Sequence, residues 1–135
     1  MLENTMTFRV RYAETDQMGI VHHANYPVYY EMGRTEMFRE IGLPYDEMER
    51  RGIMLPLVDL HCDYKKPAYY DQELTLTTMV KAMPSTRIRF DYRLTNQAGE
   101  TINEGYTTLV FMDSQKRRPV RIPTDLANEL EKFFI

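Results

Sequence analysis

The side chains best suited to chemistry gather in one short polar segment near the N-terminus. Asp16, Gly19, His22 and His23 lie between residues 13 and 25, where the sequence has neither strand-like nor helix-like periodicity. Irregular segments of this kind often carry function. The Asp16 carboxylate could attack an electrophile or deprotonate a water. Its plainer role would be to cap a turn, and Gly19 would let the chain turn back.

A long helix is expected directly after this segment, from Asn25 to Ile41. Asn25 is a suitable cap, Pro27 suits a first turn, and Gly42 suits the position after the helix end. Free N–H groups and the positive end of the helix dipole would face the polar segment, and both favour a developing negative charge. One apolar stripe recurs at helical spacing, with Tyr26, Tyr29/Tyr30, Gly33, Met37 and Ile41. Gly33 within it would let another backbone come close.

Strands dominate the rest of the chain. The alternation of residues 87–94 is the clearest period-two pattern. Strands are expected at 7–12, 53–66, 74–82, 87–95, 101–112 and 120–122, and further helices at 44–51 and 126–134. We therefore predict one α+β domain over residues 1–135, with an antiparallel sheet wrapped around the long helix. An exposed sheet edge would favour a homo-oligomer.

Composition narrows the class of protein. The chain has 135 residues, a net charge of −3 and one cysteine. The acidic balance disfavours a nucleic-acid partner, and no apolar run is long enough to predict a membrane span. The first residues resemble no secretory signal, and a single cysteine fits a reducing compartment, so a cytoplasmic location is expected.

Residues 11–26, Arg-Tyr-Ala-Glu-Thr-Asp-Gln-Met-Gly-Ile-Val-His-His-Ala-Asn-Tyr, resemble the signature of the 4-hydroxybenzoyl-CoA thioesterase family. The likeness continues through Tyr29-Tyr30-Glu31 and Arg34, and more loosely through residues 64–71. It implies the hotdog fold, an acyl-CoA substrate, no cofactor, and a homodimer or homotetramer with its active site at a subunit interface. The histidine pair is most similar to the bacterial acyl-CoA thioesterases of the family, whereas the founding enzyme has aromatic residues there.

The resemblance also assigns roles to residues. It makes Asp16 the nucleophile or general base and places the His23 backbone N–H on the thioester oxygen. The His23 side chain would orient water or Asp16, and Glu31 would orient the loop or remain a solvated helix residue. Neighbouring His22 and His23 should point in different directions. A metal site that joins this pair to His61, Cys62 and Asp63 is disfavoured, because His61 and Cys62 should face opposite sides of a strand and no zinc-motif spacing appears. The expected substrate-binding residues are Gly19, Val21, His22, Asn25, Tyr26, Lys66 and Arg87.

CoA phosphates require basic side chains, and Arg87 is the first choice. The other basic candidates are Lys65, Lys66, Lys81, Arg89 and residues 116–118. Three alternatives remain open. They are a hotdog hydratase or dehydratase, a non-catalytic acyl-CoA binder, and a structural oligomerising domain. A hydratase or dehydratase would need a His followed by a loop that contains Gly and ends in Pro, and the sequence lacks this arrangement. A structural oligomerising domain would give no reason for the polar segment.

Overall fold

A computed structural model describes residues 1–135. Its main strands are β1 (Leu2–Arg9), β3 (Leu57–Tyr64), β4 (Glu73–Val80), β5 (Arg87–Asn96) and β6 (Thr101–Val110). Its helices are the one-turn η1 (Tyr12–Glu14), α1 (Asn25–Glu40), α2 (Tyr45–Arg50) and α3 (Thr124–Glu131). Three two-residue strands, β2 (Ile53–Met54), β7 (Met112–Asp113) and β8 (Arg118–Pro119), form a small second sheet in the order β2-β7-β8.

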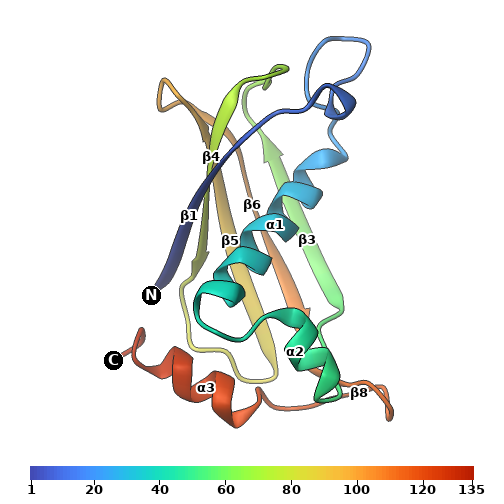
Figure 1. Cartoon of the computed structure of the whole chain (residues 1–135), viewed down its shortest axis with the longest axis vertical. Helices are drawn as coiled ribbons and strands as arrows, with labels where there is room; N and C mark the ends of the chain where they lie inside the picture. The colour runs from blue at the N-terminus through green and yellow to red at the C-terminus, as the bar shows by residue number, and fades with distance from the viewer.

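The large sheet is antiparallel and has the order β1-β4-β5-β6-β3, so β1 and β3 are its edges. Helix α1 lies across one face of it (Figure 1). The expected arrangement of a sheet around one long helix is therefore confirmed. Strand β5 shows the physical basis, because Ile88, Phe90, Tyr92 and Leu94 are buried under α1 while the alternate residues face outward.

Three expected strands differ from the structure. The first runs over Leu2–Arg9 instead of 7–12, and Tyr12 is exposed in η1. The expected strand 53–66 is divided into β2 and β3, with Pro56 between them; proline lacks the N–H that a continuous ladder needs. No strand forms at 120–122, where β8 ends instead at Pro119.

Helix α1 buries the expected stripe, although Ile41 is only partly buried. Gly33 does permit a close approach, but by side chains instead of backbone. A Cβ at this position would collide with the side chains of Thr78 and Leu76 on β4. Gly42 has a φ of 85° just beyond the helix, as expected for a glycine that ends it.

Edge strand β3 is left uncovered. Apart from Cys62, all of its residues are exposed, including the apolar Leu57, Val58, Leu60 and Tyr64. Cys62 and Tyr64 pair with Gly105 and Asn103 on β6, and Asn103 bonds the Tyr30 hydroxyl of α1. The side of β3 that faces α1 is therefore an apolar strip beside an unpaired edge.

Candidate functional site

The polar segment folds into a tight loop that returns on itself. Thr15 and Val21 form an isolated bridge, and the Asp16 N–H donates to the Ile20 carbonyl at 2.9 Å. The Gly19 N–H donates to the Asp16 carbonyl at 2.9 Å, and Gly19 has a φ of 78°. This left-handed conformation favours glycine, so Gly19 makes the expected turn.

The Asp16 carboxylate makes the turn-capping contact that the sequence left open as its plainer role. Its Oδ1 accepts the Met18 N–H at 2.8 Å, which is a turn-capping contact. Its Oδ2 accepts no hydrogen bond from the chain, and the residue lines a hollow of about 330 Å³. One oxygen therefore fixes the loop, and the other has no hydrogen-bond partner in the chain.

Glu14 ties the loop to α1. Its carboxylate is buried and accepts the Tyr29 hydroxyl at 2.9 Å, the Arg11 N–H at 2.8 Å and the Arg11 guanidinium at 2.7 Å. Its backbone carbonyl accepts the His22 N–H and the Asn25 side-chain amide. Burial raises the pKa of Glu14, but hydrogen bonds from Arg11 and Tyr29 outweigh burial and leave this pKa below its usual value.

The start of α1 provides a free backbone donor. The His23 N–H has no hydrogen-bond partner in the chain, whereas the Ala24 N–H donates to His22 Nδ1 at 3.2 Å. The Tyr64 hydroxyl donates to the His23 carbonyl at 3.1 Å and so steadies this turn. Asn25 is not the cap; Ala24 occupies that position, and the Asn25 side chain bonds Glu14 instead.

The two histidine rings lie together, contrary to expectation. Their centroids are 4.3 Å apart, with an interplanar angle of 33°. Both residues are exposed, and His23 lines the hollow that holds Asp16. The divergence expected of neighbouring residues fails because the chain turns here into α1 instead of continuing as a strand.

Tyrosines form much of the wall behind these groups. Tyr26 is buried and meets Tyr64 edge-on, with ring centroids 5.4 Å apart. Burial, with a smaller contribution from Tyr64, raises the pKa of Tyr26 to about 12, so its hydroxyl stays protonated at neutral pH. Ile20, Val21, Lys65, Lys66 and Pro67 also line the hollow.

Two expected site residues lie elsewhere in the chain. Glu31 is eight residues beyond His23 on α1, about 12 Å along the helix axis, and it makes no hydrogen bond to the loop. Glu14, not Glu31, holds the loop. Arg87 pairs with Val110, at the end of the sheet opposite Tyr64. Lys66 does line the hollow, but it pairs with Glu100.

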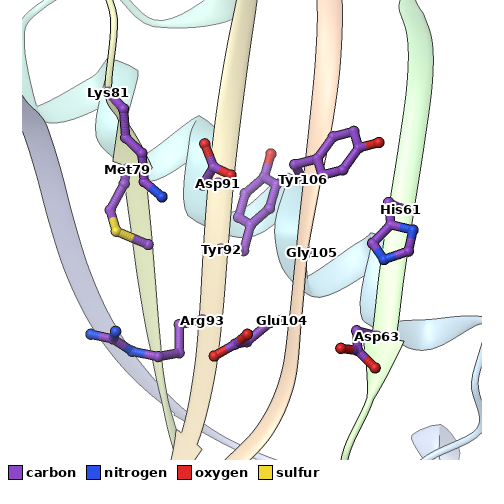
Figure 2. A pocket seen from close by; sticks show the side chains of 10 residues that line it. All are labelled: His61, Asp63, Met79, Lys81, Asp91, Tyr92, Arg93, Glu104, Gly105 and Tyr106. Carbon is purple, nitrogen blue, oxygen red and sulfur yellow. The ribbon is translucent and has the colours of Figure 1, made fainter.

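The outward face of the sheet carries a separate polar hollow of about 320 Å³ (Figure 2). His61 is in its wall and stacks on Tyr106, and the Arg89 guanidinium lies 3.9 Å from the same ring. Lys81 also lines this hollow, and Asp16 is not among its lining residues. Cys62 faces the other way, toward Tyr30 and Tyr64, and burial raises the pKa of its thiol. The prediction that His61 and Cys62 face opposite sides is confirmed.

Sequence reasoning did not identify Glu14 or Tyr64 as site residues. A glutamate three residues after an arginine would be expected to form a solvated ion pair, and the contact that buries Glu14 is with Tyr29, fifteen residues away. Tyr64 is 41 residues from the carbonyl that it binds. No local pattern carries either contact.

Comparison with known proteins places this geometry in a family. The model of the thioesterase-like superfamily matches residues 10–130. The chain belongs to this superfamily. It is 38% identical over 112 residues to the YneP protein of Bacillus subtilis (strain 168), covering 83% of this chain and 81% of that one. It is 29% identical over 133 residues to the acyl-CoA thioester hydrolase YbgC of Escherichia coli O157:H7, covering 96% and 99%.

A solved relative confirms the fold of this superfamily member. The DHNA-CoA thioesterase of Staphylococcus aureus superposes with a TM-score of 0.93 at 30% identity, over 99% of this chain and 92% of that one. The expected α+β hotdog fold and the expected thioester hydrolase activity are thus confirmed. None of the helices is long and apolar enough to cross a membrane.

Proposed function

We propose that this thioesterase hydrolyses acyl-CoA esters to a free acid and CoA, with Asp16 as nucleophile or general base. The Asp16 Oδ2 would attack the thioester carbonyl or take a proton from the attacking water. The His23 N–H would stabilise the developing oxyanion, a contribution of about 10²–10³ in rate in other enzymes. The CoA thiolate then leaves without a strong acid, because thiols of this kind ionise near pKa ~8.5.

The observation that carries this proposal is the pairing of two unsatisfied groups at one hollow. Asp16 offers a free carboxylate oxygen there, and His23 brings a free backbone N–H from the start of α1. A thioester needs a nucleophile or base and an oxyanion donor, and the hollow offers one of each. The exposed His23 ring is available to orient a water beside them.

We further propose that two copies pair through their β3 edges to form a dimer with the active site at its interface. The edge backbone is unpaired, and the adjoining strip of Leu57, Leu60 and Tyr64 is apolar and exposed. Antiparallel pairing about a twofold axis would set the Arg87 end of one copy beside the Lys66 end of the other. Both cations would then lie near the CoA phosphates. The dimer or a tetramer built from it would act in the cytoplasm, where the free thiol of Cys62 would stay reduced.

The test is thiol release by the wild type and Asp16→Asn from a panel of acyl-CoA esters, short aliphatic to aromatic. Asparagine keeps the oxygen that accepts the Met18 N–H, so the loop should remain intact. We expect the wild type to hydrolyse some esters and kcat to fall at least ~10²-fold in the variant. Equal activity would transfer the catalytic role to Glu31. No release from any ester by the wild type would favour a non-catalytic acyl-CoA binder.

A further inference from the structure

The backbone carbonyl of His23 lies where the helix cannot provide its usual hydrogen bond. The Asn25 N–H donates to the His22 carbonyl at 2.9 Å, so a tight turn leads from His22 into α1. Within this turn Ala24 already has helical angles, with a φ of −71° and a ψ of −12°. In a helix the His23 carbonyl would accept the N–H of residue 27, four positions along. That residue is Pro27, which has no N–H, and no other backbone donor bonds this carbonyl.

Tyr64 supplies the missing donor from the sheet. Its hydroxyl donates to the His23 carbonyl at 3.1 Å, which is the one hydrogen bond that this carbonyl accepts. Tyr64 is the last residue of β3, and its ring packs edge-on against Tyr26 in the first turn of α1, with centroids 5.4 Å apart. Burial, followed by the nearby Cys62 thiol, raises the pKa of the Tyr64 hydroxyl, so it remains a donor at neutral pH.

This contact fixes the residue that carries the free N–H. The direction of the His23 N–H depends on the two peptide planes that meet at the His23 Cα, since rotation about φ and ψ moves one plane against the other. The plane before His23 is held by the Asn25 N–H on the His22 carbonyl. The plane after it is held by Tyr64, and otherwise only by the Ala24 N–H, which donates to the exposed His22 ring at 3.2 Å.

We propose that Tyr64 is a positioning residue for thioester hydrolysis: its hydroxyl supplies the hydrogen bond that Pro27 cannot supply, and so fixes the His23 N–H that receives the developing oxyanion. The proposal rests on the proposed function, in which this N–H is the oxyanion donor. Tyr64 acts through His23 and not on the reacting atoms. Because negative charge develops on the thioester oxygen only in the transition state, Tyr64 should affect kcat more than KM.

The experiment measures kcat and KM of the full-length protein with the ester of the acyl-CoA panel that the wild type hydrolyses fastest. Tyr64→Phe keeps the ring against Tyr26 and removes only the hydroxyl. We expect kcat to fall about 5–20-fold with KM within about twofold, since a displaced oxyanion donor loses part of the about 10²–10³-fold that such a donor contributes. Tyr70→Phe is the matched control, because Tyr70 is a similarly exposed tyrosine that packs edge-on against Tyr12, and it should change neither constant.

A second variant separates the hydrogen bond from other roles of the tyrosine. Pro27→Ala supplies an N–H at position 27, and alone it should change kcat by less than about threefold, since Tyr64 already bonds the His23 carbonyl and alanine suits a helix. In the double variant Pro27→Ala/Tyr64→Phe, the new N–H should bond this carbonyl and return kcat to within about threefold of the wild type. If only the ring or the strand position of Tyr64 mattered, a donor at position 27 could not restore activity.

A kcat of Tyr64→Phe equal to that of the wild type, or a loss that Pro27→Ala does not reverse, would overturn the proposal while leaving acyl-CoA hydrolysis intact. If the wild type hydrolyses no ester, the proposed function fails, and NMR relaxation of the ¹⁵N-labelled protein tests the contact by itself. The order parameter of the His23 N–H should then fall from about 0.85 in the wild type toward about 0.6 in Tyr64→Phe and recover in the double variant. An order parameter that Tyr64→Phe leaves unchanged would overturn the positioning role.

Discussion

At the scale of single residues, two positions in the loop stand out: Gly19 has a left-handed backbone conformation, and Asp16 has a carboxylate with one oxygen unbonded. Gly19 lies in the left-handed region, where other residues are strained, and it turns the loop that presents Asp16. Asp16 in turn divides its carboxylate between the Met18 N–H and the hollow. Catalysis at the proposed site would therefore depend on the backbone conformation of Gly19 as well as on the Asp16 carboxylate.

Gly19→Ala tests this dependence. An alanine in left-handed conformation costs about 1–2 kcal/mol, and the loop would relax to avoid it. We expect kcat/KM to fall severalfold or more, as well as a small loss of stability in urea. Gly42→Ala is the matched control, because Gly42 has a similar φ of 85°, open space around it, and a place at the far end of α1. The explanation fails if both variants keep full activity.

At the scale of elements, the contact between the loop and α1 depends on one buried carboxylate. Glu14 joins η1 to α1 through Tyr29 and to its own turn through Arg11. Separately, the Glu14 backbone carbonyl accepts the His22 N–H, next to the free N–H of His23. Without the Glu14 carboxylate, the helix start and the loop would lose their buried side-chain anchor.

Glu14→Gln should lower the free energy of unfolding by about 1–3 kcal/mol, because the buried hydrogen-bond network loses the negative charge and one of the two acceptor oxygens of Glu14. Urea unfolding measures this loss. Glu129→Gln breaks only an exposed pair with Lys132 and should change stability by about 0.5 kcal/mol or less. An equal effect of the two substitutions would contradict the anchoring role of Glu14.

The pH dependence of stability should reveal the same residue. The pKa of Glu14 is lower in the folded chain than its ordinary value of 4.5. Its stabilisation is therefore fully present above pH 4.5 and is lost as the pH falls through the folded pKa. The difference in unfolding free energy between wild type and Glu14→Gln should shrink below pH 4.5, measured by urea unfolding from pH 7 to 3. A difference that is constant over this range would exclude ionised Glu14 as its source.

At the scale of the whole molecule, the β3 edge leaves an apolar strip of the single chain exposed. Its apolar strip faces the same side as α1 and ends at Tyr64, which lines the Asp16 hollow. A second copy paired at this edge would bury the strip and lie beside the Asp16 hollow. Oligomerisation and catalysis should therefore fail together.

Leu60→Arg places a charge in the middle of this strip, and Leu60 is 40% exposed in the single chain, so the fold should tolerate it. We expect light scattering after gel filtration to show the 16.1 kDa monomer where the wild type forms a dimer or tetramer, with loss of thioesterase activity. Met83→Lys, at an exposed apolar residue 37% accessible in the β4–β5 turn, should change neither. A fully active Leu60→Arg monomer would rule out an interface site.

The sequence by itself determined the long helix, most of the large sheet and the polar loop before the helix. Period-two and helical spacing defined β5 and α1 because each pattern reports the buried face of an element. The polar segment with its motif predicts Asp16 and the start of α1 as the reactive groups, and this stays a prediction. Only the tertiary structure decided which distant groups meet. The bond of Tyr64 to the His23 carbonyl, the burial of Glu14 against Tyr29, and the distance of Glu31 from the loop depend on how the sheet and helix pack, and such contacts leave no local pattern in the chain.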